Sequence, residues 1–184
     1  MHWKKNDWLF LGCYKKSSIL FSILVFFAPV LQAQNAASPA QVKAALVYNF
    51  MKYAEWPADP GRGPLTLCIA YADHQVEAAF AAVNGRTIDT RQVQVHSLLN
   101  GENTAQCHLI YIHDGRAREM LQELSTKQIH LLTIGDHEDF VDVGGAIGLV
   151  EQNGRLQFKV NLDVIKRGNY RISSQLLKLA VNTR

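Results

Sequence analysis

Short apolar runs, spaced along the chain, constrain the fold of this 184-residue protein more than any other feature. Residues 65–71, 108–112 and 129–134 are rich in aliphatic side chains and have the length of buried strands. Residues 92–96 alternate apolar and polar side chains, which is typical of a half-buried strand. These runs predict four strands of a β-sheet.

Helix signals lie before and between these strands. Ser38 followed by Pro39 predicts the start of a first helix, and Asp73 predicts the cap of a second. A third helix is expected over residues 114–125. The apolar spacing of the first helix predicts a core-facing side made of Val42, Ala45, Leu46, Asn49, Phe50 and Tyr53.

The pattern changes toward the C-terminus. Residues 146–150 and 155–160 read as two strands joined by a turn with Asn153-Gly154, a strong hairpin signal. A short helix at 163–167 and a last helix capped by Ser173 or Ser174 follow. The whole pattern predicts an α/β fold: a three-layer sandwich with a mixed β-sheet flanked by helices, ending in a β-hairpin and helix.

The N-terminal segment has the pattern of an export signal. Four lysines precede residues 17–30, which carry no charge, and Ala33 offers a small residue at a cleavage site. The alternative is a retained membrane anchor, but the apolar stretch is short for a spanning helix and contains Pro29. We expect a signal peptide over residues 1–33 and a single domain over residues 34–184.

Removal of this leader changes the charge of the chain. The full sequence has a net charge of +3, but the leader holds four lysines and Asp7. Residues 34–184 therefore carry 15 basic and 15 acidic residues. Because no basic stripe interleaved with aromatic residues remains, nucleic-acid binding is not expected.

Two cysteines remain after the leader. Cys68 lies inside one predicted strand and Cys107 immediately precedes another, so neighbouring strands would allow a bridge near the end of the sheet. An even number of cysteines in an exported chain favours a disulfide. The alternative is two free, buried thiols that pack as small apolar groups.

Several histidines and an acidic loop are candidate metal ligands. His108 and His113 flank one strand, and His130 lies in sequence reach of either, but no cysteine or carboxylate joins them at ligand spacing. Residues 136–139 (Asp-His-Glu-Asp) have suitable atoms, yet four adjacent loop residues seldom converge on one ion. We therefore interpret them as a solvated acidic loop and expect no metal or other cofactor.

No set of residues forms a convincing catalytic site. The glycine-rich residues 144–148 enter a strand and not a helix, which favours a turn or a close backbone approach over phosphate binding. Asn49 and Asn161 are interpreted as structural, with Asn161 capping the next helix, and Trp56 as a core residue. We expect a protein that is not an enzyme.

Four stretches are spread in order over most of the length of the chain after the leader: residues 43–57 (KAALVYNFMKYAEWP), 107–112 (CHLIYI), 144–162 with its GGAIGL and FKVNL segments, and 172–180 (ISSQLLKLA). In combination they resemble the YfiR-like family (DUF4154).

This resemblance implies a periplasmic regulator, often a homodimer, that binds and inhibits a membrane-bound diguanylate cyclase and so controls cyclic-di-GMP signalling and biofilm formation. It also implies an OmpA-like outer-membrane lipoprotein that relieves the inhibition, and a Cys68–Cys107 disulfide. A second cysteine pair known in the family, near residues 140–149, is missing here. The resemblance does not identify the binding surface, and a histidine kinase is an alternative partner.

Two other functions remain open. A small-molecule-binding sensor domain would use a pocket near Asn49, Trp56 or the acidic loop. A hydrolase is a more distant alternative, since no nucleophile and base can be paired.

Overall fold

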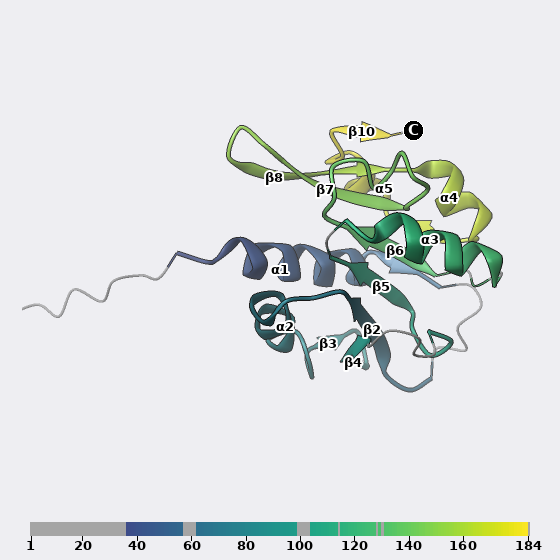
Figure 1. Cartoon of the computed structure of the whole chain (residues 1–184). Coiled ribbons are helices and arrows are strands. Elements are labelled where there is room, and N and C mark those ends of the chain that lie inside the picture. Colours follow the sequence, from purple (N-terminus) through teal and green to yellow (C-terminus); the bar gives the residue numbers. More distant parts are fainter. Residues whose placement is uncertain are drawn as a thin grey trace, which may run out of the picture. The chain divides into compact units, whose positions relative to one another are not determined.

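The computed structural model describes residues 36–183 apart from 57–61, 99–103, 114, 128 and 130. In this part of the chain eight strands form one sheet, in the order β10-β8-β7-β6-β5-β2-β4-β3 (Figure 1). The main strands are β2 (Leu65–Ala70), β4 (Arg91–Leu98), β5 (Leu109–Ile112), β6 (Leu132–Gly135), β7 (Ile147–Gln152) and β8 (Arg155–Val160). The edges are the short strands β3 (Thr87–Ile88) and β10 (Asn182–Thr183). A separate antiparallel pair consists of β1 (Ala54–Glu55) and β9 (Arg171–Ile172).

The sheet is mixed. The five strands β4, β2, β5, β6 and β7 run parallel to one another, whereas β8 is antiparallel to β7 and β3 is antiparallel to β4. The predicted α/β class with a mixed sheet is therefore confirmed. The four two-residue strands were not predicted, because so short a segment has no sequence period of its own.

Helices cover both faces of the sheet, because successive side chains of each strand point to opposite sides. One face carries Leu67, Leu109 and Ile134 and packs against α1 (Pro39–Lys52) and α2 (His74–Ala81). The other carries Cys68 and Ile110 and packs against α3 (Ala117–Thr126). Two shorter helices, α4 (Leu162–Arg167) and α5 (Ser174–Leu177), add buried residues to the first layer. The three layers match the prediction.

Most predicted helix starts and the hairpin turn are confirmed. Ser38 forms a capping box with Gln41, and Asp73, Asn161 and Ser173 each accept a hydrogen bond from a backbone N–H of the helix that follows. The turn between β7 and β8 uses positive φ at both central residues, 53° at Asn153 and 70° at Gly154. These signals are local, and the rest of the fold does not alter them.

The predicted core-facing side of α1 is largely wrong. The buried residues are Ala44, Val47, Phe50 and Met51, whereas Asn49 is exposed and Val42 and Tyr53 are 42% and 41% exposed. The helix carries apolar residues on two sides, so helical spacing alone fits either side. The sheet and α2 select one of them. Asn49 consequently interrupts no buried surface.

Two boundaries also differ from expectation. β6 begins at Leu132 instead of residue 129, and α3 begins at Ala117 instead of residue 114. Its N-cap, Arg116, makes no capping hydrogen bond with its side chain. Boundaries of this kind depend on where neighbouring strands stop pairing, and local sequence encodes that poorly.

The glycine-rich segment allows an aromatic ring to approach the backbone. Phe140 is fully buried, with one ring edge against Gly135 and the other against Gly145. A Cβ atom at Gly145 would overlap both the ring and the Phe140 carbonyl oxygen. Gly144 adopts a φ of 104°, a conformation that favours glycine. The predicted turn with close backbone approach is confirmed.

We predict that Gly145→Ala destabilises the protein by about 1–3 kcal/mol, because the added methyl group must displace Phe140 within a packed core. Urea denaturation followed by circular dichroism measures the change. Gly115→Ala is the matched control, since the nearest atoms to its Cβ would be 4.0 Å away. Equal stability of the two variants would contradict the packing described for Phe140.

Candidate functional site

The carboxyl ends of three adjacent parallel strands place ionisable side chains close together. Asp73 follows β2, His113 follows β5 and Asp136 follows β6. In the sheet these strands are neighbours, in the order β6-β5-β2. Ligand sites of open α/β sheets form beyond the carboxyl ends of the strands. The carboxyl ends of these strands, called the carboxyl edge of the sheet below, are therefore the candidate functional site.

Asp136 is the centre of this group. Its side chain is only 5% exposed. Its Oδ2 accepts hydrogen bonds from Lys43 Nζ at 2.6 Å, Tyr111 Oη at 2.8 Å and His113 Nδ1 at 2.9 Å. The interpretation of residues 136–139 as a solvated loop is therefore wrong for Asp136. The local sequence does not reveal this burial, because the partners of Asp136 lie far away in sequence. His137 and Glu138 are exposed, as expected.

These contacts set the charges of the cluster. Burial alone would raise the pKa of the Asp136 carboxyl, but hydrogen bonds from His113, Lys43 and Tyr111 outweigh burial and hold this pKa below its ordinary value. Burial and the negative charge of Asp136 raise the pKa of the Tyr111 hydroxyl. At neutral pH Asp136 is therefore ionised and Tyr111 is a hydrogen-bond donor.

Sequence reasoning missed Lys43 and Tyr111 as members of this cluster. The hydroxyl group of Tyr111 could have indicated this cluster. Tyr111 lies inside the apolar strand β5, and a buried tyrosine hydroxyl usually has a hydrogen-bond partner. The sequence around Lys43 does not indicate a buried ion pair, because lysines are common on helix surfaces. Its partner lies 93 residues away, and only the tertiary structure brings the two together.

A cleft of about 340 Å³ adjoins the cluster. Asp136 and Glu138, from the segment after β6, line the cleft, and the β7–β8 hairpin supplies Glu151 and Lys159. Leu149 and Val181 add apolar surface. This lining combines charges of both signs with aliphatic side chains and suits a small polar molecule. The sequence analysis named Asn49, Trp56 and the acidic loop as candidates for lining a pocket. Of these, only the acidic loop lines this cleft.

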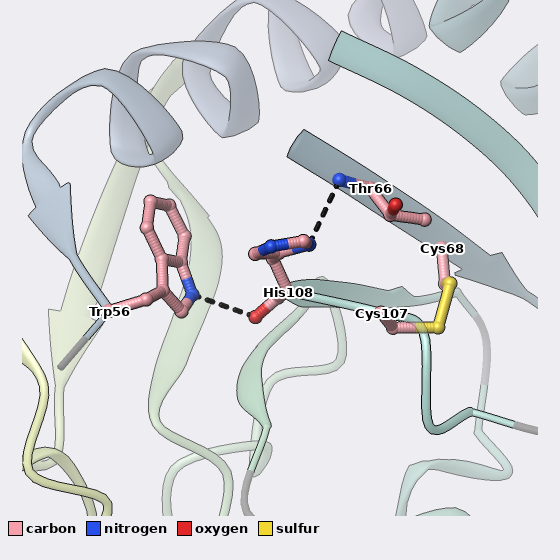
Figure 2. Close-up of a disulfide and its surroundings, with 5 residues drawn as sticks. All are labelled: Trp56, Thr66, Cys68, Cys107 and His108. Atoms are coloured by element: carbon pink, nitrogen blue, oxygen red, sulfur yellow. Dashed lines mark hydrogen bonds between the residues drawn. A yellow bond between two sulfur atoms is a disulfide. The ribbon is translucent and has the colours of Figure 1, made fainter. Parts of the chain in front are cut away.

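A second polar cluster lies at the amino ends of β2 and β5 (Figure 2). Trp56 Nε1 donates a hydrogen bond of 2.8 Å to the backbone oxygen of His108. His108 Nδ1 accepts one of 3.1 Å from the backbone N–H of Thr66. Trp56 is half-buried and packs against the main core, in line with its predicted structural role.

A disulfide joins Cys68 to Cys107 beside this cluster (Figure 2). Its Cα atoms are 5.8 Å apart, within the usual range. The bridge links β2 to the residue just before β5, and β2 and β5 are adjacent parallel strands. The pairing favoured from the sequence is therefore present, near the end of the strands as expected.

The remaining sequence candidates lie apart. His108 and His113 are at opposite ends of β5 and contact different partners, while His130 lies outside the described residues. No group of three or more His, Cys, Asp or Glu side chains suited to a metal ion occurs in the described ranges. Asn161 caps α4 through Oδ1, and its Nδ2 donates to the Val141 oxygen at 3.4 Å.

The fold and its strand-end cluster define an α/β domain with a mixed sheet and helices on both faces. A model of the YfiR/HmsC-like family (DUF4154) matches residues 40–181. The chain belongs to this family. Its members are periplasmic regulators of cyclic-di-GMP signalling, and the family is regulatory and not catalytic.

Solved structures share the fold at low identity. A conserved domain protein from Vibrio cholerae O1 biovar eltor strain N16961 superposes with a TM-score of 0.54 at 10% identity, covering 80% of this chain and 60% of its own. An ABC domain from Streptococcus pneumoniae, solved in complex with L-Trp, superposes with a TM-score of 0.51 at 12% sequence identity. The match covers 79% of this chain and 62% of that domain's chain. This chain thus spans less than two thirds of either protein.

A search for membrane spans covers the same described residues. None of the helices there is both long enough and apolar enough to cross a bilayer.

We predict that replacing both Cys68 and Cys107 by serine destabilises the folded chain by about 4 kcal/mol, the loop-closure value for some forty residues. Urea denaturation of the double variant, with the wild-type protein in oxidising buffer as reference, measures this loss. In reducing buffer the wild-type protein should approach the variant. A variant as stable as the oxidised wild type would contradict a stabilising bridge.

We predict that Asp136→Asn destabilises the protein by about 3 kcal/mol, because the change leaves the Lys43 ammonium without its counter-charge in a partly buried site. The matched control is Asp139→Asn in the same loop, whose side chain is 46% exposed. That change should stay within about 0.5 kcal/mol. Similar losses in both variants would show that the Asp136 contacts are not the cause.

Proposed function

We propose that this protein binds the periplasmic region of a membrane-bound diguanylate cyclase and holds the enzyme inactive. Its absence would raise cyclic-di-GMP and favour biofilm formation. The observation that carries this proposal is the family match over residues 40–181. A regulator of this kind acts through its surface, so it needs a stable, preformed framework more than a reactive site.

The contacts of α1 support such a framework. Lys43 near its start binds Asp136 at the carboxyl edge of the sheet, and Trp56, just after β1, binds His108 at the amino edge. Tyr48 Oη also donates to the Thr87 oxygen at 2.7 Å. A helix that is held near its start and in its middle, with the chain just after it also fixed, keeps its surface in place, which reduces the free-energy cost of ordering on binding.

The direct test is binding of the purified protein (residues 34–184) to the purified periplasmic region of a diguanylate cyclase from the same cell. Calorimetry should show saturable binding, and deletion of the gene should raise cyclic-di-GMP. Absence of both effects would contradict the proposal. Binding to the periplasmic region of a histidine kinase instead would replace the cyclase as partner.

Export is part of the same proposal. Residues 1–33 are proposed to be a signal peptide that is removed after Ala33, with residues 34–184 remaining as one domain. We predict that the protein recovered from the periplasmic fraction begins at Gln34 or within a few residues of it. Intact-mass measurement checks this. A periplasmic product that retains all 184 residues would contradict cleavage.

Two further partners follow from the family resemblance. We propose that the protein forms a homodimer and that an OmpA-like outer-membrane lipoprotein relieves the inhibition by binding it. Analytical ultracentrifugation tests the first point, and competition between the lipoprotein and the cyclase region tests the second. A monomer, or a lipoprotein that leaves cyclase binding unchanged, would contradict the respective point.

The cleft at the carboxyl edge favours a second candidate function, a sensor of small molecules. Its carboxylates outnumber its single lysine, so a ligand that carries an amine is the best electrostatic match. Thermal shift with a panel of amino acids and polyamines should reveal a raised melting temperature. Glu138→Gln should reduce the shift and the exposed Glu119→Gln, on α3, should not. No shift with any compound would count against a sensor of this class.

A further inference from the structure

His113 lies between two carboxylates that come from different elements. Its Nδ1 is 2.9 Å from Asp136 Oδ2, and its Nε2 is 3.9 Å from Asp73 Oδ2. The side chain is 23% exposed. The ring also stacks on that of Tyr111, with centroids 6.4 Å apart. The imidazole is therefore held in place with one nitrogen directed to each aspartate.

The contact with Asp136 determines which nitrogen carries hydrogen in the neutral ring. An ionised carboxylate only accepts hydrogen bonds, so Nδ1 must be the donor. Nε2 is then an unprotonated acceptor that faces a second acceptor, the Asp73 carboxylate. A proton on Nε2 converts this unfavourable approach into an attraction between opposite charges and leaves the Asp136 hydrogen bond intact.

The charged groups around His113 favour this protonation. Lys43 on α1 is positive, while Asp73 at the start of α2 and Asp136 at the end of β6 are negative. The Tyr111 hydroxyl on β5 is neutral. With a neutral imidazole the group carries one net negative charge, and with an imidazolium it carries none. Protonation of His113 therefore balances the charge at this edge.

The pKa of His113 follows from the same contacts. The hydrogen bond to Asp136 raises it, burial and Lys43 lower it, and the charges of Asp136 and Asp73 raise it, with a net increase. Because the folded-state pKa lies above the unfolded value of about 6.5, the stabilising contribution is complete below that pH. It is lost as the pH rises through the higher folded-state pKa.

We propose that His113 is a proton switch between the helices and the sheet. Protonated on Nε2, His113 ties Asp73, and with it the start of α2, to the Asp136–Lys43 pair. Deprotonated, it releases Asp73. Since Asp73 Oδ1 caps α2 by accepting from Val76 N–H at 2.8 Å, the first turn of α2 is the element that responds. Asp136 also lines the cleft, so the switch acts beside that candidate site.

The first test is a pH titration by NMR. It follows the carbon-bound ring protons of the histidines in the wild-type protein and in Asp73→Asn. Asparagine keeps an N-cap acceptor but removes the charge. The His113 midpoint should lie above the ordinary histidine pKa of about 6.5 and should fall in the variant, because the negative charge of Asp73 that favours the imidazolium is gone. A His113 midpoint below about 6.5 in the wild-type protein, or a midpoint that is the same in the variant, overturns the proposal.

The second test measures the response of α2. Hydrogen exchange at the Val76 amide, corrected for the intrinsic pH dependence, should be more protected at about pH 5.5 than at about pH 8. In His113→Gln this difference should disappear, because glutamine is neutral at both values. The same pH dependence in wild type and variant would overturn the switch, whether or not the protein binds a cyclase.

Discussion

The negative charge of Asp136 must be neutralised inside the protein, and much of the structure depends on how this is done. Its side chain is 5% exposed, so an unpaired carboxylate there would be strongly destabilising. The three donors that compensate it come from α1, β5 and the residue after β5. The electrostatic requirement of one side chain thereby fixes the start of α1 against the carboxyl edge of the sheet.

The two edges of the sheet are held by different chemistry. At the amino edge a disulfide, a tryptophan N–H and a histidine that accepts from the backbone join β2, β5 and the chain after α1. At the carboxyl edge the links are ionic and include His113. The amino edge thus has a covalent link, whereas the carboxyl edge is held by charged side chains, among them the proposed switch residue His113. That edge also holds the cleft.

Local signals allowed part of this structure to be predicted. The strand of residues 65–71, the Asn153-Gly154 hairpin and the caps at Ser38, Asp73 and Asn161 depend on neighbouring residues, and all are present. The buried side of α1 was mistaken because two sides of the helix are apolar. The charge cluster was missed because Asp136 and Lys43 are 93 residues apart.

The sequence by itself determined the α/β class, the positions of most strands and helix starts, and a pair of cysteines placed to meet. It also carried the four stretches typical of the YfiR-like family. Only the tertiary structure decided which side of α1 is buried and which polar residues gather at the strand ends. The physical reason is that local conformation depends on near neighbours, whereas burial and charge pairing depend on residues that the sheet order brings together from distant parts of the chain.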